Sequence, residues 1–257
     1  MHLNLKSIIS NKYNSNSQKI RVLTEKWVYN NIYCPHCGNH INEYENNRPV
    51  ADFYCAKCKE DFELKSKNGK VGKKIVDGAY DTMIARLTSS QNPNFFFLTY
   101  DKKSLDISNF IIIPKHFFIP EIIEKRNPLS SNAKRAGWVG CNILLDMIPK
   151  SGKLFYIKDG IEQSKNQILE QWHKFNFLTN FSNIQAKGWL LDIIKCIELL
   201  DKNSFTLQEI YAFEPQLHKK YPQNNNIQAK IRQQLQILRD KRYLKFIGRG
   251  KYKLEAQ

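Results

Sequence analysis

The hydrophobic pattern in the first two thirds of the chain predicts a mixed sheet flanked by helices. Apolar runs of strand length, rich in aromatic and β-branched side chains, predict buried strands at residues 94–100, 110–114 and 154–158. Apolar residues at helical spacing predict a helix that begins after Ser17, and further helices over residues 78–87 and 162–175. The mixture of strands and covering helices favours the α/β class. The basic stretch between residues 66 and 77 is expected to be a mobile loop.

The last third of the chain has a different pattern, which predicts a winged helix. An apolar stripe predicts a helix over residues 186–200, and Thr206 with Glu209 predicts a capping box at the start of a short second helix. A third helix is expected at 227–240, followed by a two-stranded ribbon. Winged helices contact DNA through the third helix and the ribbon, although similar bundles also bind proteins. We therefore expect two domains, residues 1–181 and 182–257.

The polar side of the expected third helix carries groups that suit DNA. Its apolar residues are predicted to face inward, which leaves a row of cations and amides on the other side. Lysine and arginine bind phosphates, and glutamine can address adenine edges in the major groove. The ribbon adds an arginine at its glycine-flanked tip. The candidate contacts in this domain are Lys230, Arg232, Gln233, Gln236 and Arg249.

Composition and charge indicate which class of partner the protein binds. The 257 residues are 42% hydrophobic and 12% aromatic, enough for a folded core, and no stretch is long and apolar enough to span a bilayer. The first ten residues lack the features of a signal peptide, so we expect a soluble cytoplasmic protein without membrane contact. Forty Lys and Arg against 24 Asp and Glu give a net charge of +16, which suits nucleic acid. The alternative is a basic surface that reflects only a lysine- and asparagine-rich composition.

Four of the six cysteines form two Cys-x-x-Cys pairs. Cys34 and Cys37 are followed, after seventeen residues, by Cys55 and Cys58. In a chain without an export signal, this spacing predicts a four-thiolate zinc site rather than two disulfides. Because four protein ligands leave no open position, we expect this Zn²⁺ to be structural.

The second cysteine pair lies between two acids, Asp52 and Glu63, and Lys65 follows two residues later. Because side chains alternate along a strand, Glu63 and Lys65 are predicted to share one face while Leu64 turns to the other. Two carboxylates and an ammonium at a sheet edge can hold Mg²⁺ and orient a water molecule. The alternative is a solvated edge strand with no catalytic role.

The pattern of Asp52, Glu63 and Lys65 after a proline-containing lead-in resembles the PD-(D/E)xK nuclease superfamily. Within it, the chain is similar to the DpnI-type, methyl-directed restriction endonucleases. The similarity runs from about Ser15 to Leu254 and includes the stretches NNRPVADFYC, NPNFFFLTY, KRAGWVGCN and IRQQLQILRDK.

This resemblance implies a PD-(D/E)xK core with a C-terminal winged helix. It implies catalysis by Asp52, Glu63 and Lys65, with Mg²⁺ held by the two acids and the carbonyl of Leu64. It also implies cleavage of double-stranded DNA at GATC sites with a methylated adenine, and recognition of that site by both domains. Related nucleases often carry a further acid on a neighbouring helix, which makes Glu25 a candidate outer ligand, although a solvated helix position is the better explanation.

A basic loop at residues 127–142 is a further candidate for DNA contact. Lys134 and Arg135 lie near Trp138, which is flanked by glycines. A tryptophan beside two cations can wedge or stack against bases while the cations bind phosphates. The alternative is a tryptophan packed against the core.

Two other functions stay open. One is a DNA-binding regulator built from a zinc knuckle and a winged helix, without catalysis. The other is a nuclease for unmodified or branched DNA with the same catalytic residues. A monomer is expected, although a transient dimer that cuts both strands is a second possibility.

Overall fold

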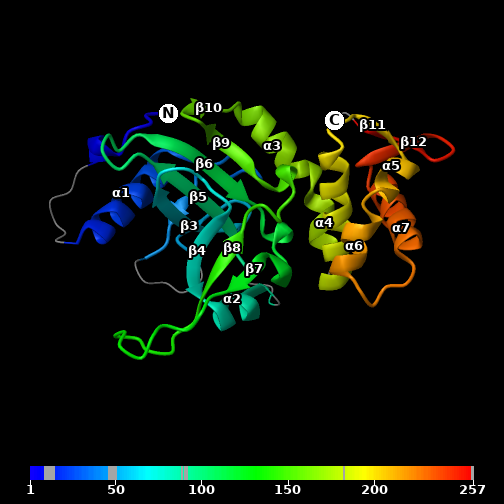
Figure 1. Cartoon of the computed structure of the whole chain (residues 1–257). Helices are drawn as coiled ribbons and strands as arrows, with labels where there is room; N and C mark the ends of the chain where they lie inside the picture. The colour runs from blue at the N-terminus through cyan, green and yellow to red at the C-terminus, as the bar shows by residue number, and fades with distance from the viewer. Residues whose placement is uncertain (9–14, 46–50, 88, 90–91, 182, 256–257) are drawn as a thin grey trace. The chain divides into compact units, whose positions relative to one another are not determined.

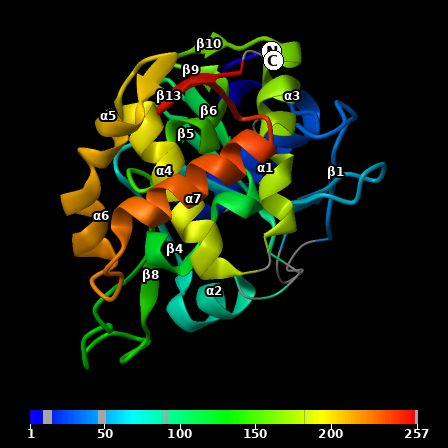
Figure 2. The same ribbon diagram turned by 90° about the vertical axis from the view of Figure 1, so that its right-hand side faces the viewer.

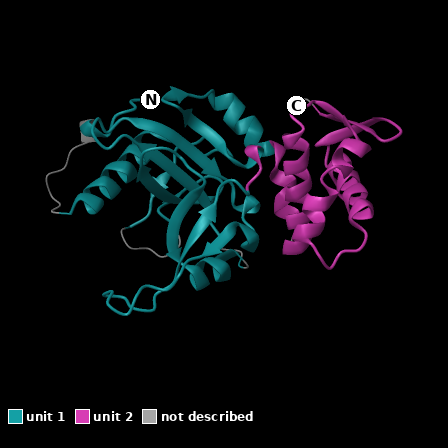
Figure 3. Cartoon of the chain, in the orientation of Figure 1, with its two compact units in different colours: residues 1–147, 151–173 teal, residues 148–150, 174–257 magenta. Residues whose placement is uncertain are grey.

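The computed structural model describes residues 1–8, 15–45, 51–87, 89, 92–181 and 183–255. The proline of the lead-in, Pro49, lies outside the described residues. The chain divides into two compact units, which Figure 3 shows in different colours. Unit 1 consists of residues 1–147 and 151–173, and unit 2 of residues 148–150 and 174–257. The predicted boundary near residue 181 stays a prediction.

Unit 1 is built on a seven-stranded sheet with the order β1-β2-β3-β5-β6-β9-β10. Strands β3 and β5 run parallel, and the other neighbouring pairs run antiparallel (Figure 1). The strands predicted at 94–100 and 154–158 have those bounds, and the third begins three residues earlier than predicted. The strands are β1 (Asn42–Glu43), β2 (Phe53–Tyr54), β3 (Asp61–Asn68), β5 (Asn94–Tyr100), β6 (Ile107–Ile113), β9 (Leu154–Lys158) and β10 (Ile161–Glu162).

Two helices contribute to the main core beside this sheet. Trp27 of α1 and Trp172 of α3 belong to the same buried cluster as the sheet residues Phe96 and Phe110. The rings of Trp27 and Phe110 meet edge to face, with centroids 5.6 Å apart. Each fully buried side chain of this size contributes about 1.5–3 kcal/mol to stability. The helices of unit 1 are α1 (Asn16–Asn31), α2 (Tyr80–Leu87) and α3 (Lys165–Lys174), with short 3-10 turns at Leu5–Ile8, Lys115–Phe117 and Pro120–Ile122.

A second, three-stranded sheet in unit 1 corrects one prediction. Its order is β4-β8-β7, with β4 at Lys74–Ala79, β7 at Ile123–Lys125 and β8 at Gly140–Leu144. The stretch from 66 to 77 was expected to be a loop, but β3 continues to Asn68 and β4 begins at Lys74. The lysines hid the alternation of β4, in which Ile75 and Asp77 are buried and Val76 is exposed.

Unit 2 combines four helices with a three-stranded sheet of order β11-β13-β12. Helices α4 and α7 pack against each other (Figure 2). Ile231, Leu235 and Leu238 of α7 are buried, as predicted. The capping box is also confirmed, because Thr206 and Glu209 exchange backbone and side-chain hydrogen bonds. The elements are α4 (Ile184–Leu199), β11 (Ser204–Thr206), α5 (Leu207–Tyr211), α6 (Glu214–Lys220), α7 (Ile227–Asp240), β12 (Leu244–Gly248) and β13 (Lys251–Leu254), with a 3-10 turn at Asn176–Asn180.

The structure corrects two details of unit 2. The short second helix, α5, ends at Tyr211, but a further helix that was not predicted, α6, follows it and has Pro215 in its first turn. The first turn tolerates proline because its amide would have no partner in the helix. The ribbon also has a third strand, since Ser204–Thr206 pairs with β13. None of the described helices meets the length and apolarity that a membrane crossing requires.

Candidate active site

The two predicted acids meet where strands β2 and β3 separate. Strand β2 pairs with β3 only at Asp61 and Phe62, so the edge of β3 is open beyond that point. Asp52, which comes directly before β2, lies at the opening: its Oδ2 accepts a 2.7 Å hydrogen bond from the amide of Leu64. The opening is a cleft of about 320 Å³. Its lining residues are Arg21, Thr24, Glu25, Asp52, Glu63, Leu64, Lys65 and Ser66.

Glu63 and Lys65 lie together on one face of β3, as their alternation predicts. The Lys65 ammonium lies 2.8 Å from Oε1 of Glu63. Leu64 turns the other way and packs against the main core. The structure therefore brings Asp52, Glu63 and Lys65 into one cleft.

Two further charged residues belong to this cluster, and sequence analysis missed both. Asp77 of β4 lies 2.7 Å from the Lys65 ammonium, and Arg86 of α2 lies 2.7 Å from Oε2 of Glu63. Neither residue is part of a sequence motif that includes Asp52. Only the buried position of Asp77 in the alternation of β4 could have drawn attention to it.

Asp52 lies among other charged groups of the cleft. Burial raises the pKa of Asp52, and the nearby charges of Glu63 and Glu25 raise it further, against the hydrogen bond from Leu64. Glu25 lines the same cleft but is paired with Arg21, whose Nε lies 2.6 Å from its carboxylate. Arg21 also lies 4.0 Å from Asp52, so the three carboxylates converge beside cations of the protein that partly offset their repulsion. Their oxygens are of the kind that a hard cation prefers as ligands.

Lys65 is held in its charged form. Burial alone would lower the pKa of its ammonium, but the carboxylates of Glu63 and Asp77 outweigh burial and raise the pKa above its usual value. A lysine in this state donates hydrogen bonds and supplies positive charge. It does not accept a proton at neutral pH.

The four predicted cysteines also come together. Two sulfur pairs, Cys34 with Cys58 and Cys37 with Cys55, lie 3.4 Å apart, and all four sulfurs are within 4.8 Å of one another. Zinc–sulfur bonds of about 2.3 Å place tetrahedral ligands about 3.8 Å apart, which matches this spacing. None of the four is in a disulfide. The cluster has the geometry of a closed four-thiolate site.

The two Cys-x-x-Cys turns have the same backbone design. In each, the amide of the residue four positions after the first cysteine donates to that cysteine's carbonyl: Gly38 to Cys34 at 2.8 Å and Lys59 to Cys55 at 2.9 Å. Both turns end in the left-handed region, with φ of 71° at Gly38 and 63° at Lys59. The second turn closes the β2–β3 hairpin, so the cysteine cluster anchors the segment between Asp52 and Glu63.

Most of the predicted basic loop lies between β7 and β8 and projects from the small sheet (Figure 1), but its last three residues, 140–142, belong to β8. Lys134 and Arg135 are exposed, whereas Trp138 is half-buried. Its ring lies against Gly140, where an added Cβ would come within 2.8 Å of the ring carbons, and the Arg135 guanidinium lies 4.7 Å from the ring centroid. Trp138 is therefore neither a free wedge nor a core residue, and its two cationic neighbours face solvent.

The predicted DNA contacts of unit 2 lie on the solvent side of α7 and at the ribbon tip. Arg232, Gln233, Gln236 and Arg249 are exposed, and Lys230 is half-buried. Two contacts tie them together within the unit: Lys230 donates to Gln233 at 2.8 Å, and Arg232 donates to the hydroxyl of Tyr211 at 2.5 Å.

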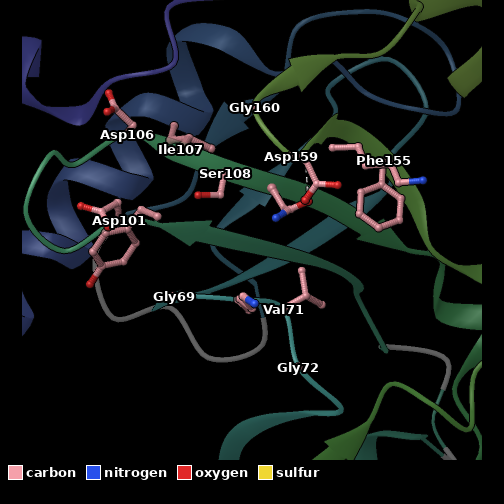
Figure 4. Close-up of a pocket in the computed structure, with 14 residues that line it drawn as sticks. Gly69, Val71, Gly72, Asp101, Asp106, Ile107, Ser108, Phe155, Asp159 and Gly160 are labelled. Atoms are coloured by element: carbon pink, nitrogen blue, oxygen red, sulfur yellow. Dashed lines mark hydrogen bonds between the residues drawn. The ribbon is translucent and has the colours of Figure 1, made fainter.

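A larger groove of about 840 Å³ lies elsewhere in unit 1 (Figure 4). Its lining residues are all different from those of the cleft at Asp52. Polar groups at its rim bind local partners: the Asp101 carboxylate accepts from two backbone amides, and the amide of Asp159 donates to Asn109. These contacts build the turns at the strand ends, and the groove adds nothing to the acid cluster.

Comparison with known protein families gives two matches. Residues 1–181 match the family described as DpnI, Dam-replacing family, and residues 185–254 match the Dam-replacing HTH domain. Together the two matches account for nearly the whole chain, in the order expected from the sequence. The chain belongs to the DpnI, or Dam-replacing, family.

Proposed function

We propose that this protein is a Mg²⁺-dependent restriction endonuclease that cuts double-stranded DNA at GATC sites carrying methylated adenine. Family membership supports a methyl-dependent restriction endonuclease in general and DNA as its partner. The observation that carries the catalytic part is the convergence of Asp52, Glu63 and Lys65 in one cleft. A DNA-binding regulator would have no use for that arrangement.

The donor set suits Mg²⁺. Asp52 and Glu63 offer carboxylate oxygens, and we assign the carbonyl of Leu64 as a third ligand. Bound Mg²⁺ would lower the pKa of a coordinated water and neutralise charge that builds on the phosphate. The hydrogen bond from the Leu64 amide to Asp52 fixes the carboxylate at the open edge of β3. Arg86 orients Glu63 from the other side.

Lys65 is assigned to electrostatic stabilisation rather than to base catalysis. Its raised pKa keeps the ammonium charged, so it can donate to the attacking water or to a non-bridging phosphate oxygen. A depressed pKa would instead suit a general base. The two flanking carboxylates favour the first role.

Recognition of the site is assigned to both domains, residues 1–181 and 182–257. In the nuclease domain the candidates are Lys134, Arg135 and Trp138, and in the winged helix the exposed side of α7 and Arg249. A methyl group on adenine adds an apolar contact in the major groove, and an aromatic ring such as Trp138 can bind it. Discrimination of about 1–3 kcal/mol per contact is usual for base readout.

The test is digestion of one plasmid isolated from adenine-methylating and from non-methylating hosts, with Mg²⁺ or with EDTA. We expect discrete GATC fragments from the methylated plasmid with Mg²⁺, and intact DNA in the other three reactions. Cutting of both plasmids would keep the catalytic site but reject the methyl specificity. Intact methylated DNA that still binds the protein would support the regulator instead.

The proposed role of the ribbon tip gives a separate prediction for binding. Arg249→Ala should weaken binding to methylated and unmethylated DNA by a similar factor, and should reduce the slope of log K against log salt by about one. The reason is that an arginine on a phosphate contributes charge without sequence information. Electrophoretic shifts at several salt concentrations measure this slope.

The matched control for this experiment is Lys102→Ala. Lys102 is an exposed cation in the turn between β5 and β6, where no DNA contact is proposed. The control removes the same charge at a position where no DNA contact is proposed. The slope of log K against log salt should therefore stay that of the unchanged protein. An equal fall in slope for both variants would reject a specific contact at Arg249.

A further inference from the structure

Asp77 is a carboxylate on the buried face of a strand. In β4 the exposed residues Lys74 and Val76 alternate with two buried ones. Ile75 is 2% exposed and Asp77 is 8% exposed. The pattern calls for an apolar side chain at position 77. A carboxylate there loses hydration, and this costs stability unless a partner compensates.

The partner is the lysine of the catalytic cleft. The Asp77 carboxylate lies 2.7 Å from the Lys65 ammonium, which also lies 2.8 Å from the Glu63 carboxylate. Lysine has a flexible four-carbon stem and many rotamers, so a single contact holds it poorly. Two carboxylates together restrict the ammonium to one position.

The contact also joins the two sheets of unit 1. Lys65 belongs to β3 of the seven-stranded sheet, and Asp77 to β4 of the small sheet. The pairing of β4 with β8 is irregular between Asp77 and Ala79. Such bulges redirect side chains and occur often beside active sites.

We propose that Asp77 is a positioning residue, which acts on the reaction by holding the Lys65 ammonium in place. This role rests on the proposed nuclease function. Asp77 does not line the cleft and lies outside the acid–acid–lysine pattern, and we assign it neither a metal ligand's role nor a contact to DNA. Its effect on cleavage passes through Lys65 alone.

The first test needs neither DNA nor metal. The folded protein is treated briefly with an amine-acylating reagent, and modification of each lysine is followed by peptide mass spectrometry. We expect Asp77→Asn, which keeps the shape and removes the charge, to raise the rate at Lys65 several-fold. Asp77→Ser provides a second variant should the first fold poorly. An unchanged rate at Lys65 would overturn the proposal.

Glu124→Gln is the matched control for this test. Glu124 pairs with Lys74 of the same strand, with Nζ and Oε1 2.6 Å apart, so the variant also breaks an ion pair of the small sheet. Here modification should rise at Lys74 and stay unchanged at Lys65. A rise at Lys65 in the control would mean general loosening of the sheet and would count against a specific role for Asp77.

The second test measures cleavage of methylated plasmid. Asp77→Asn should lower kcat by about 10–100-fold, the range expected for a misplaced catalytic group, and leave KM within about threefold. Glu124→Gln should cut at the unchanged rate. If the wild-type protein is active and Asp77→Asn has the same kcat, the positioning role is rejected and the proposed nuclease function is kept. An inactive unmodified protein rejects the proposed function and with it this role.

Discussion

Asp52→Asn should abolish cleavage of methylated DNA, with a loss of about 1,000-fold or more, while the chain stays folded and binds DNA. Asparagine keeps the size of the side chain and an oxygen that can accept the hydrogen bond from the Leu64 amide, now 2.7 Å from Oδ2. What it removes is the negative charge that we assign to Mg²⁺ binding. The effect should therefore fall on the chemical step.

The same variant should be at least as stable as the unchanged protein when metal is absent. The folded-state pKa of Asp52 is raised, mainly by burial, so its ionised form is disfavoured in the folded chain. Such a carboxyl destabilises the fold most at a pH above its folded-state pKa, where it is ionised. The destabilisation disappears as the pH falls below the pKa of the unfolded state, where the carboxyl is protonated in both states. Asparagine removes this charge, and Tm at pH 7 in EDTA should be equal or higher.

Three measurements check the prediction: single-turnover cleavage, DNA binding in EDTA and thermal unfolding in EDTA. Asp106→Asn is the control, because it makes the same chemical change in unit 1, at the rim of the groove that does not meet the cleft. Its cleavage rate should be unchanged. Near-normal cleavage by Asp52→Asn would show that the carboxylate takes no part in the mechanism. The acids would then be solvated side chains at the edge of the sheet, without a catalytic role.

Local pattern was sufficient to place Glu63 and Lys65. Their alternation on β3 follows from strand geometry, and the bounds of β5 and β9 follow from continuous apolar runs. The order of elements predicted a mixed α/β unit followed by a helix-turn-helix domain, and the fold and the family matches confirm both. These features depend on neighbours in sequence or on a period of two.

The missed features depend on contacts between distant segments. Strand β4 carries lysines at its start, and only its pairing with β8 makes it a strand. The same pairing brings Asp77 to Lys65, twelve positions earlier in the chain, and helix α2 brings Arg86 to Glu63. No spacing rule links these residues, because the turns between them can vary in length without changing the contact.

Zinc gives the second large effect. We expect one Zn²⁺ per purified chain, and we expect Cys55→Ser to lose it together with most of the folded state at 37 °C. Cys34 and Cys55 are fully buried and belong to the main core cluster with Phe53 and Phe62. Apparent binding free energies of about 10–16 kcal/mol are typical of four-ligand zinc sites in small domains. The free energy lost with the ion is therefore as large as the free energy of unfolding of most domains.

The control for the zinc prediction is Cys196→Ala. Cys196 is buried in α4 and is not part of the four-cysteine cluster, so its loss should leave the zinc content at one and cost only about 1 kcal/mol of packing. Metal analysis by mass spectrometry and thermal unfolding separate the two variants. If Cys55→Ser keeps a normal Tm, the cluster does not stabilise the fold.

The zinc site should also matter for cleavage, through the hairpin that carries both acids. The turn at Cys55 closes β2 onto β3, and the amide of Asp52 donates to the carbonyl of Phe62 at 2.9 Å. Release of the turn frees Asp52 from its place beside Glu63. Prolonged treatment with a strong chelator, followed by removal of the chelator and addition of Mg²⁺ alone, should therefore leave the protein inactive, whereas Zn²⁺ with Mg²⁺ should restore cleavage. Recovery with Mg²⁺ alone would show that the acids keep their positions without the zinc clip.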